Sequence, residues 1–339
     1  MSVAKSGDRI NNYILEELIG TGSFGQVWRA RHHVFPDRVA IKIPTDARYV
    51  QNLRLEGVAI HGLRHPNIVR ALDLDPYADP PYFIMELIEG ASLRSAIGAH
   101  PSGLPTSAVA AVMRGMLQAL KAAHVAGLIH RDVKPANILL ACEPNGLQSL
   151  NESMVKVADF GLGRAGGITA ASIMQSGSLL TEDGRSISGT LAYMSPEQKE
   201  GREIDSRSDL YSCGIVLFEM LTGELPSGSD MPSSFRADLP AYFDEVFRRC
   251  YTRLDRRFAS ADDVLGALQR TGAARVLHTD MGLLCPSCRA PVQRRDQFCI
   301  HCGVQLVEAV PRCAACHAYV HQTDRFCIFC GSDLRVKTV

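Results

Sequence analysis

The pattern of apolar and polar positions first indicates a strand-rich amino-terminal part. Residues 13–43 alternate polar and apolar positions around glycines, and Val27, Val39, Ile41 and Ile43 are strong strand formers. Alternation of this kind places every second side chain on one face of a strand. We therefore expect this stretch to begin an antiparallel sheet.

Helical spacing replaces this alternation from Pro105 onward. Between Pro105 and Ala126 the apolar residues recur every three to four positions, and Gly127 follows as a stop signal. A second helical pattern covers residues 215–221, and residues 241–268 can hold two more helices. The chain to about residue 270 is therefore expected to be mainly helical after its first third.

Two stretches lack a clear period, and one stretch repeats. Residues 161–189 are rich in glycine, serine and threonine, which predicts a long loop. Residues 271–284 form a short linker. Beyond it, the segment from Cys285 to Cys302 returns 28 residues later as the segment from Cys313 to Cys330. The repeat predicts two copies of one small unit.

Length and composition restrict the class of protein. A chain of 339 residues predicts two or more structural units, and 46% hydrophobic with 21% charged residues is ordinary for a globular protein. The 36 basic and 36 acidic side chains cancel, so no overall field favours nucleic acid or a membrane surface. Residues 1–12 lack a signal-peptide pattern, and no run approaches the roughly 18 apolar residues that span a bilayer. We therefore expect a cytoplasmic protein without membrane contact.

The cysteine-rich end predicts a metal module. Two identical CxxC-x10-CxxC units follow one another, and Zn²⁺ binds four thiolates in a tetrahedron. A module this small needs metal for much of its stability. We predict two zinc ions, bound by the following cysteines: Cys285, Cys288, Cys299, Cys302, Cys313, Cys316, Cys327 and Cys330.

Several alternatives stay open for this module, which resembles a double zinc ribbon. Each site is built from successive pairs in that family, although interleaved pairs are also possible. Redox-active thiols and, at Cys313–His317, a haem attachment motif are weaker alternatives. Seven basic and four acidic residues lie within 285–339, so the zinc-loaded module is near neutral. That charge disfavours nucleic acid and favours recruitment of a protein partner or regulation.

A glycine loop upstream indicates phosphate binding. Residues 20–27 read GTGSFGQV, and missing side chains let backbone N–H groups approach phosphate oxygens. The same glycine spacing suits a dinucleotide-binding turn, which requires a following helix, but Val27 and Trp28 favour a strand. A plain hairpin turn is the remaining alternative.

Lys42 follows at a strand end and Glu56 lies 14 residues further on, where the two side chains can form an ion pair.

The strongest motif is HRDVKPAN over residues 130–137, followed by Asp159-Phe160-Gly161. With these motifs residues 13–270 resemble the eukaryotic-like, bacterial-type serine/threonine protein kinases. The resemblance implies an α+β, bilobal protein-kinase fold: an antiparallel sheet lobe, then a helical lobe, and here a zinc-ribbon module at 285–335.

The resemblance also implies the roles of the motif residues. Asp132 accepts the proton of the substrate hydroxyl, and Lys134 neutralises the transferred phosphoryl group. Asn137 and Asp159 hold Mg²⁺, and Lys42, held by Glu56, binds the ATP phosphates. The implied partners are ATP and protein substrates that carry serine or threonine. The other implied ATP-binding residues are Ile19, Gly20, Thr21, Gly22, Ser23, Phe24, Gly25, Val27, Ala40, Met85, Glu86, Leu87, Ile88 and Leu139.

Further matches surround this site. Residues 189–197 resemble the substrate-binding loop and the Ala-Pro-Glu ending of the activation segment, with Ser195 in place of alanine. By resemblance Glu197 pairs with Arg257, and Asp209 supports the catalytic loop. Hydroxyls between Asp159 and Glu197 predict autophosphorylation of this segment. A catalytically silent scaffold and a zinc-ribbon adaptor are the rival functions, although the motif residues of the kinase site are all present.

Overall fold

The computed structural model describes residues 4–22, 25–46, 49–160 and 191–272, with positions 313, 315, 316, 326, 330 and 332–334. The side chains of residues 22, 52, 56, 59 and 269–272 are outside this set. The chain divides into two compact units, residues 1–272 and 273–339. None of the helices among the described residues is long and apolar enough to cross a membrane.

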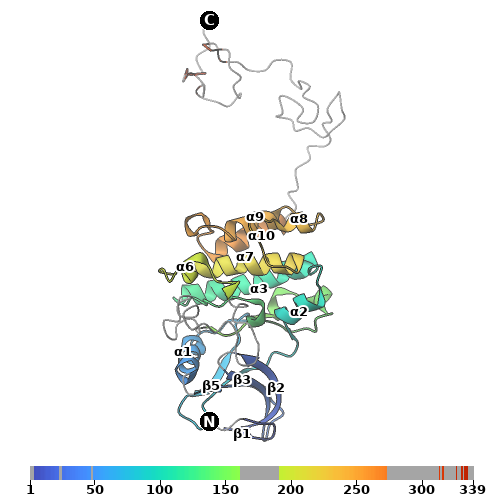
Figure 1. Cartoon of the computed structure of the whole chain (residues 1–339), viewed down its shortest axis with the longest axis vertical. Coiled ribbons are helices and arrows are strands. Elements are labelled where there is room, and N and C mark those ends of the chain that lie inside the picture. Colours follow the sequence, from blue (N-terminus) through green and yellow to red (C-terminus); the bar gives the residue numbers. More distant parts are fainter. Residues whose placement is uncertain are drawn as a thin grey trace. The chain divides into compact units, whose positions relative to one another are not determined.

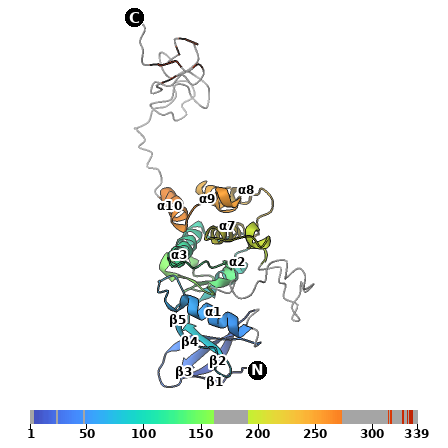
Figure 2. The ribbon, with the colours of Figure 1, turned by 90° about the vertical axis from the view of Figure 1, so that its left-hand side faces the viewer.

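The first unit begins with a twisted antiparallel sheet (Figure 1). Its strand order is β1-β2-β3-β4-β6-β5. Its strands are β1 (Arg9–Ile10), β2 (Tyr13–Gly22), β3 (Gly25–His32), β4 (Arg38–Ile43), β5 (Ala71–Asp75) and β6 (Tyr82–Glu86). The helix α1 (Val50–His61) connects β4 to β5 and lies beside the sheet (Figure 2). The strands predicted within residues 13–43 are thus confirmed as β2, β3 and β4.

The pleat of β4 assigns its side chains to two different cores. Val39, Ile41 and Ile43 pack with Trp28 and Leu15 in the core of the sheet lobe. Ala40 lies on the opposite face, in the large core that continues into the helical part. Because successive side chains of a strand alternate between faces, Lys42 lies on the same side as Ala40. One strand therefore builds the core of the sheet lobe and also positions the site lysine.

The second part of this unit is helical (Figure 1). It also carries a small sheet with the strand order β7-β8-β9. The small strands are β7 (Ala91–Ser92), β8 (Ile138–Leu140) and β9 (Val155–Val157). The helices are α2 (Leu93–Ala99), α3 (Thr106–Val125), α6 (Pro196–Lys199), α7 (Arg207–Thr222), α8 (Pro232–Phe235), α9 (Tyr242–Cys250) and α10 (Ala261–Gly272). Short 3-10 turns are η2 (Pro135–Asn137), η3 (Leu147–Ser149), η4 (Glu152–Met154) and η6 (Leu254–Arg256).

Two central helices form the middle of the helical part. Every residue of α7 from Ser208 to Thr222 is buried, as expected of a helix surrounded by other elements. α3 ends just before Gly127, which has φ 74°, a left-handed conformation that glycine adopts without strain. The predicted helix at 105–126 is therefore confirmed, as are two helices within 241–268. The predicted loop at 161–189 lies outside the described residues.

A close approach explains one glycine of α3. The backbone carbonyl of Glu152 and the side chain of Val155 lie against Gly115, so that a Cβ there would come within 2.7 Å of both. The same region receives the buried Asn67, whose amide donates to the carbonyl oxygens of Glu152 (2.5 Å) and Val155 (2.8 Å). These contacts join α3, the loop between α1 and β5, and the stretch from η4 to the start of β9.

Candidate active site

The catalytic-loop motif folds so that two side chains converge on one carboxylate oxygen. Oδ2 of Asp132 accepts a hydrogen bond from Lys134 Nζ at 2.8 Å and from Asn137 Nδ2 at 3.0 Å. Asn137 Nδ2 also donates to the backbone oxygen of Asp132 at 2.9 Å. The short turn η2 brings Asn137 back towards Asp132, since its first residue, Pro135, favours a turn start. The orientation of the Asp132 carboxylate is therefore fixed.

The backbone before Asp132 is held from α7. The buried carboxylate of Asp209 accepts from the N–H of His130 (2.9 Å), the N–H of Arg131 (2.8 Å) and His124 Nε2 (2.7 Å). Arg131 has φ 70°, a left-handed conformation that costs a non-glycine residue about 1 kcal/mol or more. Asp209 thus fixes a strained backbone directly before the catalytic-loop aspartate, as the resemblance implied.

Asp159 faces the strand that carries Lys42. Its Oδ1 lies 2.9 Å from Lys42 Nζ, and the Lys42 side chain is only 7% exposed. Asp159 also has a left-handed φ of 61°. The next residue, Phe160, is buried and its ring lies 4.5 Å from the ring of His130. The predicted ion pair between Lys42 and Glu56 lies outside what is described, because the Glu56 side chain is not among the described ones.

Most of the apolar residues predicted to surround adenine are buried or partly buried. Ala40 and Met85 face each other in the register of β4 and β6, and both are buried. Val27, Leu87, Ile88 and Leu139 are partly buried against the same core. Ile19 is 46% exposed and does not join that core. Most of the apolar residues predicted to contact adenine therefore belong to, or pack against, one core, whereas Ile19 does not.

The glycine loop closes the β2–β3 hairpin. Gly20 pairs with Val27, Thr21 with Gln26, and Gly22 with Gly25. A Cβ on Gly25 would collide with the carbonyl group of Ile43, which explains why glycine stands there. Two predicted loop residues, Ser23 and Phe24, lie outside the described residues.

The carboxylate of Glu86, a predicted ATP-binding residue, is engaged by two protein groups. Its Oε1 accepts from the N–H of Arg70 at 2.7 Å and from Lys156 Nζ at 2.9 Å. Lys156 belongs to β9, so this contact connects the β6 end with the helical part of the unit.

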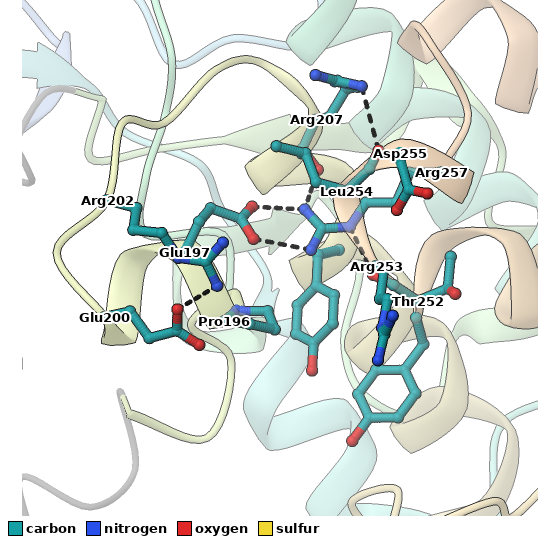
Figure 3. A pocket seen from close by; sticks show the side chains of 12 residues that line it. Pro196, Glu197, Glu200, Arg202, Arg207, Thr252, Arg253, Leu254, Asp255 and Arg257 are labelled. Carbon is teal, nitrogen blue, oxygen red and sulfur yellow. Dashed lines mark hydrogen bonds and ion pairs between the residues drawn. The ribbon is translucent and has the colours of Figure 1, made fainter.

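A buried ion pair joins Glu197 to Arg257 (Figure 3). Arg257 donates to both carboxylate oxygens of Glu197, and Ser208 Oγ donates to Oε1 at 2.6 Å. Burial alone would raise the pKa of Glu197, but the hydrogen bonds from Arg257 and Ser208 outweigh it and lower the pKa to about 2. The pair lines a cavity of about 810 Å³ that includes Tyr251 but no residue of the catalytic loop.

Ser195, the departure from the usual alanine, has a structural role. Its side chain accepts from the N–H of Gln198, and the Gln198 side chain accepts from the N–H of Ser195 at 3.1 Å. This reciprocal pair is a capping box at the start of α6. Sequence reasoning missed Gln198, although a Ser followed three residues later by Gln is the signature of such a box.

In the second unit, three of the predicted zinc ligands come together. The Sγ atoms of Cys313, Cys316 and Cys330 lie within 4.8 Å of one another, and those of Cys313 and Cys330 are 3.5 Å apart. Tetrahedral Zn–S bonds of about 2.3 Å imply sulfur separations of about 3.8 Å, so this donor set fits zinc. Contacts with Ser332, Cys316 and Cys313 lower the pKa of Cys330 to about 6. The other predicted ligands lie outside the described residues: Cys285, Cys288, Cys299, Cys302 and Cys327.

Residues 13–265 match the family model of the protein kinase domain, and the chain therefore belongs to the protein kinase family. Residues 285–331 match the double zinc ribbon. The predicted resemblance and fold class are thus confirmed.

Curated relatives carry serine/threonine-kinase names. The chain is 38% identical over 241 residues to serine/threonine-protein kinase PknL of Mycobacterium bovis, covering 68% of this chain and 55% of that protein. It is 33% identical over 284 residues to serine/threonine-protein kinase Pkn1 of Myxococcus xanthus, covering 78% of this chain and 38% of that protein. The chain thus spans about half the length of the curated relatives or less.

Solved kinase structures have the same fold. The PknI kinase domain of Mycobacterium tuberculosis matches with a TM-score of 0.60 at 24% identity, covering 79% of this chain and 100% of that chain. At that identity the likeness concerns the fold alone. The crystal structure of Rad53 1-466 in complex with AMP-PNP matches with a TM-score of 0.58 at 26% identity, covering 76% of this chain and 64% of that chain.

Proposed function

We propose that this protein is a serine/threonine protein kinase that transfers the γ-phosphoryl group of ATP to protein hydroxyls. The observation that carries the proposal is the convergence of Lys134 and Asn137 on Asp132, in the same compact unit as the Lys42–Asp159 ion pair. The family match and the names of the curated relatives support it. A lysine two residues after Asp132 favours serine and threonine over tyrosine as acceptors, by resemblance.

The chemistry follows from what phosphoryl transfer needs. The acceptor hydroxyl oxygen bonds to the γ-phosphorus, the bond to the β–γ bridging oxygen breaks, ADP leaves, and the hydroxyl proton must be taken up. Asp132 takes this proton, and its fixed orientation directs the acceptor oxygen. Lys134 stabilises the charge on the transferred group, because electrostatic stabilisation is the main contribution in this reaction.

Asn137 and Asp159 fit Mg²⁺ as ligands. Amide and carboxylate oxygens are the hard donors that Mg²⁺ prefers, and the Nδ2 of Asn137 is directed to Asp132, which leaves its oxygen on the other side of the amide. Bound Mg²⁺ supplies positive charge that neutralises the phosphates. Lys42 binds the α and β phosphates, and Glu56 holds Lys42 in place.

The remaining nucleotide contacts are assigned by position. The backbone of residues 20–25 covers the phosphates, and the adenine ring lies between Val27, Ala40 and Leu139. Met85 limits the depth of this pocket, and the backbone of residues 86–88 binds the adenine edge. Ile19 and Thr21 contact the nucleotide from the hairpin.

Intact mass after incubation with Mg²⁺ and ATP tests the proposal. Phosphatase-treated wild type should gain about 80 Da per phosphate, and Asp132→Asn should gain nothing. Peptide mapping should find the phosphates within residues 161–190, where we propose autophosphorylation as a switch that acts through Arg131. If wild type and Asp132→Asn gain equal mass, or neither gains any and no generic protein substrate is phosphorylated, the proposal is wrong.

We further propose that the cysteine module binds two Zn²⁺ ions. The cluster of Cys313, Cys316 and Cys330 supports sites built from successive CxxC pairs, because both CxxC pairs of the second repeat contribute to it. The bounds that we propose are 13–270 for the kinase domain, 271–284 for the linker and 285–335 for the zinc module. Metal-binding thiolates are typical of a reducing cytoplasm, and we assign the module to regulation or recruitment of a protein partner.

A further inference from the structure

A glutamine outside the kinase motifs reaches the catalytic loop. Gln198 is the third residue of the four-residue helix α6. Its Nε2 donates to the backbone oxygen of Arg131 at 2.9 Å. The two residues are 67 positions apart in the chain. Gln198 contacts neither the nucleotide-binding residues nor Asp132 in the hydrogen bonds described above, so its effect must pass through the backbone of Arg131.

The peptide groups of Arg131 need support on both sides. Its φ of 70° is unfavourable for a side chain with a Cβ, and such a conformation persists only when its surroundings hold it. Asp209 accepts from its N–H, and Gln198 donates to its carbonyl. Because the next residue is Asp132, relaxation of the Arg131 peptide would move the backbone from which the Asp132 side chain extends towards Lys134 and Asn137.

The hydrogen bonds also determine which way the Gln198 amide faces. Its Oε1 accepts from the N–H of Ser195 and from Ser195 Oγ, both at 3.1 Å. A donor on one side and a carbonyl acceptor on the other permit one orientation only, with oxygen towards Ser195 and nitrogen towards Arg131. Glutamate would preserve the capping box but would place an oxygen against the Arg131 carbonyl. The position therefore requires an amide for a reason that helix capping does not supply.

We propose that Gln198 is a positioning residue for phosphoryl transfer, holding the Arg131 peptide and through it the Asp132 carboxylate. This inference rests on the proposed kinase function. Ser195 and Gln198 stand where the segment of residues 161–197 ends, so the bond joins the end of that segment to the catalytic loop. A change in the backbone at Ser195 is then transmitted to Asp132 through a single side chain.

Two variants of Gln198 separate positioning from capping. Gln198→Glu keeps the acceptor for Ser195 and loses the donor to Arg131, whereas Gln198→Met loses both. Ser260→Ala is the matched control for stability: Ser260 caps α10 by bonds with Asp263 at 2.7 and 3.2 Å, away from the catalytic loop. Steady-state phosphorylation of myelin basic protein, thermal unfolding, and hydrogen–deuterium exchange of the peptide covering residues 128–137 are measured for each full-length variant.

We expect both Gln198 variants to lower kcat between about tenfold and a hundredfold, with the KM for ATP within about twofold of wild type. All three variants should lower Tm, because each removes at least one hydrogen bond of the folded protein, so Tm alone does not separate the roles. Exchange of residues 128–137 should rise in both Gln198 variants and stay at the wild-type level in Ser260→Ala. A pure capping role instead predicts wild-type kcat and exchange for Gln198→Glu.

Either of two results would overturn the inference. One is a Gln198→Glu protein with wild-type kcat and wild-type exchange; the other is an equal loss of kcat in Ser260→Ala. If wild type itself phosphorylates nothing, the proposed function fails, and the exchange measurement still decides whether Gln198 holds the loop. Raised exchange in Gln198→Glu would then support the contact, and unchanged exchange would exclude it.

Discussion

Arg257 and Glu197 form a two-pronged ion pair across 60 residues of sequence: Nη1 lies 2.5 Å from Oε1 and Nη2 lies 2.9 Å from Oε2. Both residues are buried, and the Arg257 guanidinium also lies 4.7 Å from the ring centre of Tyr211. A buried charge that loses its partner pays most of its desolvation cost alone. The pair therefore ties the start of α6 to the η6 region that precedes α10.

Arg257→Met should lower the free energy of unfolding by about 3–5 kcal/mol, because it leaves the Glu197 carboxylate buried without its cation. Urea denaturation at pH 7 measures the loss. Lys121→Met is the control, since its partner Asp262 is exposed, and exposed pairs contribute about 1 kcal/mol or less. Equal losses in the two variants would contradict the role assigned to the buried pair.

Acid should weaken the same contact in a defined pH range. The pKa of Glu197 is lowered from 4.5 to about 2 in the folded protein, where hydrogen bonds overcome the effect of burial. A depressed carboxyl pKa contributes stability that is complete above pH 4.5 and is lost as pH falls towards about 2. Between pH 6 and 3 wild type should therefore lose more stability than Glu197→Gln, as measured by urea midpoints. Parallel pH profiles of the two proteins would show that Glu197 does not contribute.

Asn67→Ala should destabilise the protein by about 2–3 kcal/mol, since it removes the amide that satisfies two carbonyl oxygens, of Glu152 and Val155. The smaller side chain cannot replace either hydrogen bond, and Asn67 is buried. Thermal unfolding monitored by circular dichroism measures the change. Asn151→Ala, which removes an exposed cap of η4, should cost less than half as much. A wild-type Tm for Asn67→Ala would contradict this account.

Zinc content distinguishes sites built from successive CxxC pairs from sites built from interleaved CxxC pairs. Replacing all four cysteines of the second repeat by serine should leave one ion per chain if successive units pair, because residues 285–302 keep a complete site. Interleaved pairing would leave none, since both sites would lose two ligands. Metal analysis of the purified full-length protein measures the ratio. Cys142→Ser serves as the control and should retain both ions.

The motif residues could be identified from the sequence because they occur at short, fixed spacings. Asp132, Lys134 and Asn137 lie within six residues, so a local turn suffices to bring them together. The alternation of β4 predicted a strand that ends at Lys42, and the structure adds which face the lysine occupies. Long-range partners such as Arg257 came only from the family resemblance, since no local pattern joins them to Glu197.

Elements whose polar residues are buried were harder to predict. The helical pattern at 215–221 is the apolar end of α7, which begins at Arg207. Its first turns contain Ser208, Asp209 and Ser212, which are buried because they bond to Glu197, the catalytic-loop backbone and the Tyr193 carbonyl. A search for regularly spaced apolar residues does not detect buried polar residues. The apolar pattern also did not predict α1. Leu53 and Ile60 are its buried apolar side chains among the described ones, which is too few to give a clear helical period.

The engagement of Glu86 with Lys156 and the Arg70 N–H has a consequence for chemical inhibition. We propose that adenine binds to the backbone of residues 86–88, so a compound at this place would meet peptide groups that any sequence presents, beside a Glu86 carboxylate that is already bound. On this proposal selectivity would depend on side chains around the adenine, such as Met85, which lies opposite Ala40 in the β4–β6 register. A compound that recruits the Glu86 carboxylate would first have to break its hydrogen bonds with Lys156 and the Arg70 N–H.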